Sequence, residues 1–497
     1  MSKPFDHSQV PYDMSNAPFG YDHGAMLTGP FAPVLKEAVL SDLEVVGEIP
    51  ADLNGVYLRN GPNPRFEPKG TYHPFDGDGM IHAAHFQGGK VTYRNKWIRT
   101  EGWKANDAQG EETHWGIMST LKGREDMPMT DVANTDVIGH AGKAVATWYL
   151  AGEPHLLDPI TLETIEVVDY SKAPGQGVSA HPKVDEFTGE MMVFDYFDHH
   201  PFMAYGVVDK TGKLVHHVPI ELPGNRLPHD MGITENYSIL HDLPVYHDEA
   251  AMAAGRHKIR FNNSMPARFG VIPRFGVIPR FGQPEEIKWF EFDPCFLYHV
   301  INCWEDDDEV VMVACRFMPV LDENGEVSEE RTAKTIAHLG MNTRLWRYRM
   351  NLKTGEAIEQ CLNPDYNIEF PSYDSARTGR YSQYAYAVDH HPDRLQWTGI
   401  RKFNTDTGEC VGAFSDSHKD CWYSEPWFAP ADNPRSEDHG YVIVFMWNDK
   451  KQEQELQVFY ALDVNKGPVA RVKLPDLVPI GFHGCWMKPS QIESWVS

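Results

Sequence analysis

The stretch Pro479-Ile480-Gly481-Phe482-His483-Gly484-Cys485 carries one imidazole between two glycines, fourteen residues before the last of 497. Glycine lets two backbone segments approach closely, so a histidine flanked in this way is typical of a ligand on a tightly packed loop. If His483 shares a metal with histidines far upstream, the site exists only after the whole chain has closed. We therefore expect this segment to close the fold and the site together.

Three upstream histidines have comparable surroundings, namely His181, His229 and His299. Each lies in a strand-like run or at the end of one, and gaps of 48, 70 and 184 residues would place the four on different repeats of the fold. A set of neutral imidazoles without a carboxylate suits zinc, copper or iron about equally well. The chain holds 24 histidines, so spacing alone does not identify the ligands.

Short strand-like runs recur along the chain, for example at 43–49, 55–59, 80–86, 90–98, 441–447 and 457–462. Turn sequences such as Asn60-Gly61-Pro62-Asn63-Pro64 separate them. Convincing helical periodicity is confined to short segments such as 248–255 and 329–338. Many short strands at regular spacing predict an all-β fold, either a sandwich or a propeller. We expect residues 1–30 to form an N-terminal arm and residues 31–497 a single domain.

The composition excludes several classes of protein. A net charge of −26 argues against a nucleic-acid partner, because phosphate binding needs a basic face. The seven cysteines form no CxxC pair, which fits a reducing compartment. The first residues lack the apolar core of a signal peptide, and no apolar run reaches about 18 residues, the length of a membrane span. We expect a cytoplasmic protein.

A six-residue repeat lies at Arg268–Gly282, where Arg-Phe-Gly-Val-Ile-Pro occurs twice and Arg-Phe-Gly follows. An even period keeps the side-chain faces of a strand in phase. The repeat is therefore either a local duplication that extends a surface hairpin or an apolar lip at a substrate entrance. The sequence leaves both interpretations open.

Six segments resemble signature motifs of the carotenoid cleavage oxygenase family, in the order in which the family has them. They are residues 55–64 (GVYLRNGPNP), 75–82 (FDGDGMIH), 229–237 (HDMGITENY), 369–371 (EFP), 424–426 (SEP) and 481–484 (GFHG). The resemblance implies a seven-bladed β-propeller, capped by loops and short helices above a metal site on its axis. It further implies one non-haem Fe(II) per chain, held by His181, His229, His299 and His483.

In the family, glutamates accept hydrogen bonds from three of the iron-bound imidazoles, and Glu369 and Glu425 match two of them. The third glutamate is missing: the corresponding strand reads Ala146-Thr-Trp-Tyr-Leu-Ala-Gly-Glu-Pro154, with Tyr149 or Leu150 at the expected position. We therefore expect an incomplete outer shell, in which a local bulge would let another group supply the acceptor. The same alignment places Trp148 and Tyr149 beside the substrate tunnel.

The resemblance implies oxidative cleavage of a conjugated C=C bond by the co-substrate O2, giving two carbonyl products. We expect a small apolar substrate, a carotenoid or apocarotenoid. Stilbene or phenylpropanoid cleavage is the alternative, but those family members use a Tyr and a Lys to hold the phenol oxygen. This chain has Trp148 or its neighbour in place of the Lys and no Tyr within Trp115–Ser119.

Two further possibilities remain open at this point. A non-enzymatic propeller that serves as a binding scaffold would also fit a weakened metal site. Peripheral contact with a membrane is compatible with a polyene substrate, because polyenes reside in lipid. The sequence makes no prediction of the oligomeric state.

Overall fold

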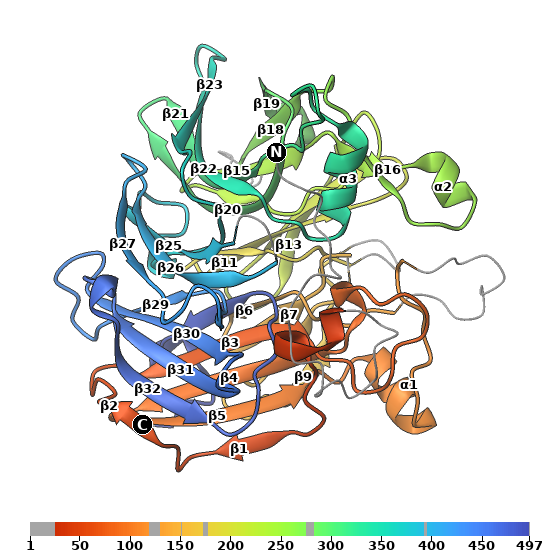
Figure 1. Cartoon of the computed structure of the whole chain (residues 1–497). Coiled ribbons are helices and arrows are strands. Elements are labelled where there is room, and N and C mark those ends of the chain that lie inside the picture. Colours follow the sequence, from red (N-terminus) through yellow and green to blue (C-terminus); the bar gives the residue numbers. More distant parts are fainter. Residues whose placement is uncertain are drawn as a thin grey trace.

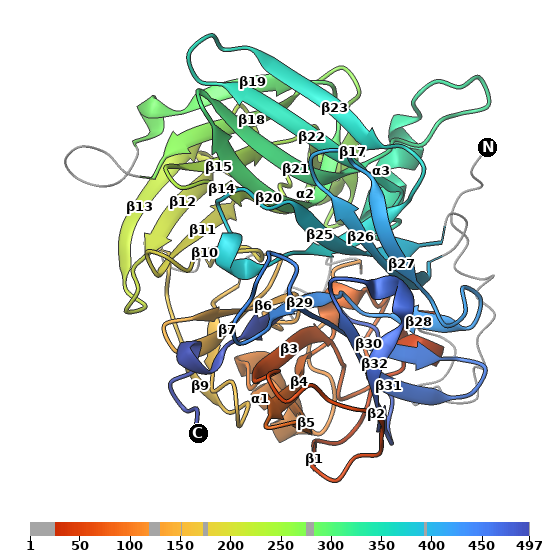
Figure 2. The same ribbon diagram turned by 90° about the vertical axis from the view of Figure 1, so that its left-hand side faces the viewer.

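The computed structural model describes residues 25–118, 130–150, 152–171, 177–274, 283–391 and 395–496. These residues form seven β-sheets of four or more strands, arranged as the blades of a propeller (Figures 1 and 2). The all-β, seven-bladed architecture expected from the sequence is confirmed. Of the expected N-terminal arm, only residues 25–30 are described, in the 3₁₀ turns η4 (Ala25–Leu27) and η5 (Gly29–Phe31).

The first three blades are antiparallel sheets in which each strand pairs with the next one named. Blade 1 contains β33 (Gly484–Met487), β3 (Gly55–Pro62), β4 (Gly79–Gln87), β5 (Lys90–Trp97) and β1 (Ala38–Leu40). Blade 2 contains β6 (Asp136–His140), β7 (Lys143–Thr147), β8 (His155–Leu157) and β9 (Thr164–Val167). Blade 3 contains β10 (Lys183–Asp185), β11 (Glu190–Tyr196), β12 (Phe202–Val208) and β13 (Leu214–Glu221).

The next three blades repeat this pattern of four antiparallel strands. Blade 4 contains β14 (Gly232–Ile233), β15 (Tyr237–Asp242), β18 (Ala267–Pro273) and β19 (Lys288–Phe292). Blade 5 contains β20 (Phe296–Asp306), β21 (Glu309–Phe317), β22 (Thr343–Asn351) and β23 (Ala357–Asn363). Blade 6 contains β24 (Ile368–Ser372), β25 (Tyr384–His390), β26 (Trp397–Asn404) and β27 (Cys410–Phe414).

Blade 7 joins the two ends of the described chain. It contains β28 (Cys421–Tyr423) and β29 (Trp427–Pro430), both paired with β30 (Gly440–Asn448), and then β31 (Glu453–Tyr460), β32 (Pro468–Leu474) and β2 (Val45–Gly47). The early strand β2 thus completes the last blade, while the late strand β33 completes the first. Figure 1 shows the red N-terminal strands beside the blue C-terminal ones. This double exchange closes the ring.

The blades pack face to face through apolar side chains, so the cores lie between neighbouring sheets rather than at one centre. Val56 and Ile81 of blade 1 pack with Val137 and Ala144 of blade 2 in one such layer. Because each sheet is covered on both faces, a strand such as β30 is apolar and buried along its whole length. These layers hold the inner strands rigidly around the axis.

Short helices and a hairpin lie outside the blades. They are α1 (Glu101–Gln109), α2 (Glu249–Ala253), α3 (Glu329–Ala337), the pair β16 (Val245–His247) and β17 (Ile259–Phe261), and the 3₁₀ turns η6 (Pro74–Asp76), η7 (Pro284–Glu286), η8 (Ser375–Arg377), η9 (Val464–Lys466) and η10 (Pro489–Gln491). The two predicted helices correspond to α2 and α3. Helix α1 was not predicted, because its polar sequence EGWKANDAQ lacks an apolar stripe. Within the described residues, no helix has the length and apolar character needed to cross a membrane.

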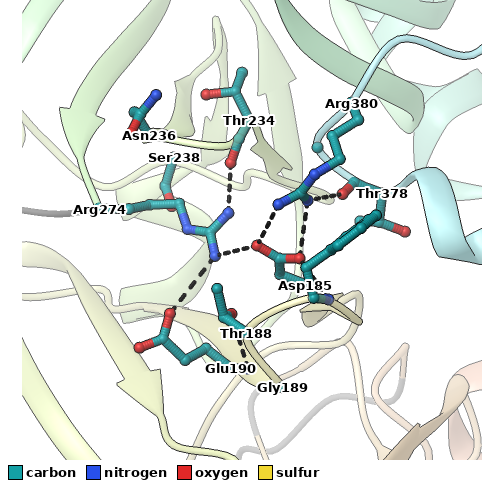
Figure 3. Close-up of polar contacts among 12 residues, drawn as sticks. Asp185, Thr188, Gly189, Glu190, Thr234, Asn236, Ser238, Arg274, Thr378 and Arg380 are labelled. Atoms are coloured by element: carbon teal, nitrogen blue, oxygen red, sulfur yellow. Dashed lines mark hydrogen bonds and ion pairs between the residues drawn. The ribbon is translucent and has the colours of Figure 1, made fainter.

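The first copy of the six-residue repeat forms β18, which pairs with β15 on one side and β19 on the other. Phe269 of this copy is fully buried inside the blade, so the choice between a hairpin extension and an apolar lip depends on the second copy. Arg274 begins the second copy and bonds to Asp185 of blade 3 at 3.0 Å, while Arg380 approaches the same carboxylate at 2.8 Å from before β25 (Figure 3). Residues 275–282 lie outside the described residues.

Candidate metal centre

Four histidines from four different blades meet at the propeller axis. His483 immediately precedes β33 of blade 1, His181 precedes β10 of blade 3, His229 precedes β14 of blade 4, and His299 lies within β20 of blade 5. The His181 ring centroid lies 4.9, 5.2 and 4.5 Å from those of His229, His299 and His483. All four side chains are buried. The strand-end positions expected from the sequence therefore converge in space.

Three of these imidazoles lie close enough together to bind one metal ion. One ligand atom from each of His181, His299 and His483 lies within 4.8 Å of the others. The Nε2 atoms of His181 and His299 are buried and have no hydrogen-bond partner, which is costly for a polar atom unless a ligand occupies it. His229 borders the cluster through ring contacts with His181 and His299 but is not part of the three-histidine group.

Glu425 anchors the closing histidine firmly. Its Oε1 lies 2.9 Å from Nδ1 of His483, and its Oε2 accepts hydrogen bonds from the Gly484 N–H at 2.7 Å and the Trp427 indole at 2.6 Å. Nδ1 is therefore held by the carboxylate, which leaves Nε2 for a metal. Glu369 holds Nδ1 of His299 in the same way and accepts from the Phe370 N–H at 2.7 Å.

The glycines beside His483 are required by close backbone approach. A Cβ on Gly481 would lie 2.9 Å from Cα of Gly61, and a Cβ on Gly484 would lie 2.4 Å from the carbonyl oxygen of Leu58. Both contacts are closer than real side chains tolerate. The motif at 481–484 is thus packed directly against the motif at 55–64, as the interpretation of a tightly packed loop required.

The backbone is strained at two points of the site. His181 has a φ of 65° and Phe370, which follows Glu369, a φ of 48°, so both adopt the left-handed conformation that residues other than glycine rarely take. The pairing of β20 with β21 also shifts register around His299. Strain and bulges of this kind concentrate where a side chain must be aimed at a functional centre.

The structure adds a third acid–imidazole contact that the sequence did not indicate. Oδ2 of Asp136, the first residue of β6 in blade 2, lies 3.2 Å from Nδ1 of His181. A buried acid at the start of an otherwise apolar strand was the available signal. The position expected to hold the third glutamate holds Tyr149, whose ring centroid lies 4.2 Å from that of His229.

Burial sets the protonation of the cluster. It lowers the pKa of His181, His229 and His299 well below the usual value, so these rings are neutral at neutral pH. Burial also acts to lower the pKa of His483, but the nearby carboxylates of Glu425, Asp136 and Asp230 together outweigh it and the net shift is upward. Because metals bind neutral imidazole, metal binding requires that Nε2 of His483 carry no proton.

Two cavities reach the cluster from different sides. The larger has a volume of about 670 Å³, within the range of small-molecule sites, and ends at His229 between Phe75, Tyr149 and Tyr298. The smaller, of about 110 Å³, is lined by the other three histidines together with residues that include Lys183. The four histidines therefore lie between a large chamber and a small one.

The walls of the larger cavity come mainly from the elements outside the blades. Helix α3 contributes Ala333 and Ile336, and β17 contributes Ile259 and Phe261. Charged side chains that include Lys258, Glu330 and Lys334 border the cavity and are exposed to solvent. The chamber therefore runs from solvent to His229, which borders the three-histidine cluster.

The two aromatic residues expected beside the tunnel have different positions. Tyr149 lines the larger cavity, whereas Trp148 does not. Trp148 is buried, and its indole donates to the carbonyl of Phe75 at 3.0 Å. Successive residues of an extended segment point in opposite directions, so only one of the two can face the cavity. The expectation for Trp148 is corrected accordingly.

Known proteins are similar in sequence to this chain over nearly its whole length. The family model described as retinal pigment epithelial membrane protein matches residues 31–488. The carotenoid 9,10(9',10')-cleavage dioxygenase of Crocus sativus is 34% identical, covering 94% of this chain and 90% of its own. Isoeugenol monooxygenase of Pseudomonas nitroreducens is 30% identical, covering 93% of this chain and 97% of its own.

A solved structure agrees with these sequence relatives. The lignostilbene dioxygenase of Pseudomonas brassicacearum superimposes with a TM-score of 0.82 at 26% identity, covering 95% of this chain and 99% of that one. The motifs, the seven blades and the histidine cluster lead to one assignment. The chain belongs to the carotenoid cleavage oxygenase family, whose enzymes cleave carbon–carbon double bonds.

Proposed function

We propose that this protein is an Fe(II)-dependent oxygenase that uses O2 to cleave one conjugated C=C bond of a carotenoid or apocarotenoid, giving two carbonyl products. The observation that carries the proposal is that His229 lies in the wall of a largely apolar cavity of about 670 Å³ and directly contacts the histidine cluster, in which two buried Nε2 atoms have no partner. Family membership supplies the reaction class.

The residues present fit a bound iron. His181, His299 and His483 offer neutral donors within 4.8 Å of one another, and His229 adjoins them as the proposed fourth ligand. Imidazole donors with carboxylates on their far nitrogens suit Fe(II), although zinc and copper also accept such donors. Bound there, Fe(II) would supply the redox chemistry that allows dioxygen to react with an alkene.

The rest of the reaction depends on positioning by the protein. Phe75, Tyr149 and Tyr298 surround the inner end of the larger cavity and would hold one double bond next to the cluster. Apolar walls exclude water, which protects reactive species and orders the substrate. The chain itself needs no acid or base in this proposal, because the two electron pairs that reduce O2 come from the substrate's double bond.

A polyene substrate is favoured by the side chains where a phenol anchor would lie. Ile117 and Met118 line the cavity within the segment in which stilbene cleavers carry a Tyr. Among the described lining residues, the lysines are Lys258 and Lys334, both exposed to solvent. A polyene needs no polar anchor near the metal, so this lining suits it.

Cleavage of a stilbene or phenylpropanoid side chain is the second candidate. Its support is the similarity to isoeugenol monooxygenase and lignostilbene dioxygenase. Several tyrosines line the cavity, and the Tyr149 phenol, whose ring packs on His229, is the one we expect to hold the substrate's oxygen in that case.

The test is to load the purified protein with Fe(II) and incubate it with an apocarotenal and, separately, with 4-hydroxystilbene. Aldehyde products are measured by mass spectrometry, with and without O2. We expect products from the apocarotenal only, only in air, and none from His483→Ala. Products from the stilbene alone would overturn the polyene assignment. A folded protein that binds no metal would support a non-enzymatic scaffold instead.

A further inference from the structure

We propose that Asp136 replaces the missing third carboxylate of the metal centre and that it does so by orienting His181 rather than His229. The inference rests on the metal site of the proposed function. It assigns a positioning role to a residue outside all six family motifs.

The propeller brings one functional side chain from each blade to the axis. Four blades supply an imidazole and the other three supply a carboxylate. In blade order these side chains are His483, Asp136, His181, His229, His299, Glu369 and Glu425. Each carboxylate lies against a histidine of a neighbouring blade, so Asp136 completes a pattern that Glu369 and Glu425 already establish.

Asp136 is held rigidly enough to orient a ligand. Its Oδ1 accepts the N–H of Val137 at 2.7 Å, and its carbonyl accepts the side-chain amide of Asn60 at 3.0 Å. The preceding carbonyl, that of Thr135, accepts the N–H of His483 at 3.2 Å. The start of β6 is therefore bound to the two motifs that close the ring, and Oδ2 remains directed at Nδ1 of His181 at 3.2 Å.

The far nitrogen of His181 is directed at the cluster. Nε2 is buried without a partner, while Nδ1 faces the carboxylate, so the acid selects the tautomer that leaves Nε2 free for a metal. His229 has no such support, because among the described residues no hydrogen bond to it is formed and Tyr149 packs on its ring. The third carboxylate therefore comes from the start of β6 instead of the segment that holds Tyr149, and it contacts His181 instead of His229.

The number of carboxyl groups that contact the imidazoles remains three, namely Asp136, Glu369 and Glu425. Asp230 is also buried nearby, but Lys183 lies 2.6 Å from its Oδ1 and pairs with it. A metal cation in the cluster would favour the charged forms of the three carboxyl groups.

The decisive variant is Asp136→Asn. If its oxygen keeps the bond to Val137, its amide N–H₂ faces Nδ1 of His181 and forces the proton onto Nε2, the atom needed for the metal. The reverse orientation clashes with the N–H of Val137 instead. We expect Co(II) affinity, measured by competition titration, to fall by about 10–100-fold, with a shift of the visible Co(II) bands.

Asp195→Asn is the matched control. Asp195 is buried, and its Oδ1 accepts the N–H of the next residue, Tyr196, at 2.8 Å, but it contacts none of the four histidines. The proposal is supported if Asp195→Asn keeps the wild-type Co(II) affinity and spectrum while Asp136→Asn binds Co(II) more weakly. Equal affinity and spectra in the two variants overturn it.

Two further measurements distinguish a folding defect, a failure of the proposed metal site and a failure of the role assigned to Asp136. If Asp136→Asn does not fold, Asp136→Ser and Asp195→Ser are compared with the same criteria. If the folded wild-type protein binds neither Co(II) nor Fe(II), the proposed metal site fails, and this inference fails with it. If the wild type binds metal and both serine variants bind equally, only the role of Asp136 is overturned.

Discussion

The two halves of the metal centre are built differently. On one side, His299 and His483 contact Glu369 and Glu425, and each glutamate is also anchored by backbone N–H groups. On the other side, Nδ1 of His181 lies 3.2 Å from Oδ2 of Asp136, and the His229 ring packs against the ring of Tyr149. The first half matches the family motifs, while the second has been rearranged. The comparison shows that a propeller can keep its ligands while changing what orients them.

The largest expected effect is the removal of a ligand from the well-anchored half. His483→Ala should lower metal affinity more than about 100-fold, because deletion of a donor exceeds the loss caused by deleting its outer partner. His229→Ala should lower metal affinity clearly less, since among the described residues no carboxylate orients that ring. Metal content after dialysis measures both, and equal losses would abolish the distinction between the halves.

The second effect comes from the carboxylate itself. Glu425→Gln keeps the size of the side chain but cannot satisfy Nδ1 of His483, the Gly484 N–H and the Trp427 indole together. We expect about 10–100-fold weaker metal binding, read by titration with Co(II). Glu305→Gln serves as the remote control, because among the described residues Glu305 accepts hydrogen bonds from Thr234 and Asn236 and from none of the four histidines.

A third variant would make the two halves alike. Tyr149→Glu places a carboxylate where the ring now packs on His229, and we expect metal affinity to rise by up to about tenfold. The metal-free protein should become less stable, because burying the new acid costs more than its contact with a neutral His229 contributes. Thermal melting with and without metal measures both effects. A rise in stability of the metal-free form would contradict this explanation.

The smallest effect is expected for Tyr149→Phe. Ring packing on His229 persists, and only the hydroxyl is lost, so metal affinity should stay close to that of the wild type. If stilbene cleavage were the activity, the same change would remove the group nearest the metal that could hold a phenol. Product formation from 4-hydroxystilbene therefore distinguishes the two substrates in a variant whose metal site is intact.

Much of this centre could be predicted from the sequence because its parts lie in contiguous motifs. Glycines 481 and 484 indicated the close packing, and the structure shows that packing against Gly61 and Leu58. The rhythm of short strands predicted an all-β sandwich or propeller, and the family resemblance implied the seven-bladed propeller. The long gaps between the histidines predicted positions on different repeats of the fold. Glu369 and Glu425 lie beside the expected rings because their motifs include the strand ends that hold them.

Other features depend on contacts between distant residues. Asp136 and His181 are 45 positions apart and belong to different blades, so no local pattern joins them. Trp148 was assigned to the tunnel with Tyr149, although neighbours in an extended segment face opposite sides. The repeat at Arg268 left two interpretations open, and its first copy is a strand between β15 and β19 of blade 4, with Arg268 bound to Asp242.

The pairing of β3 with β33 has a consequence for the kinetics of folding. Val56 pairs with Met487, so closure joins residues more than 400 positions apart, and such non-local pairing forms slowly. The four histidines then come together only after the main barrier has been crossed. Contacts absent from the transition state slow unfolding without speeding folding. We therefore expect added metal to leave the refolding rate unchanged and to prolong the lifetime of the closed ring.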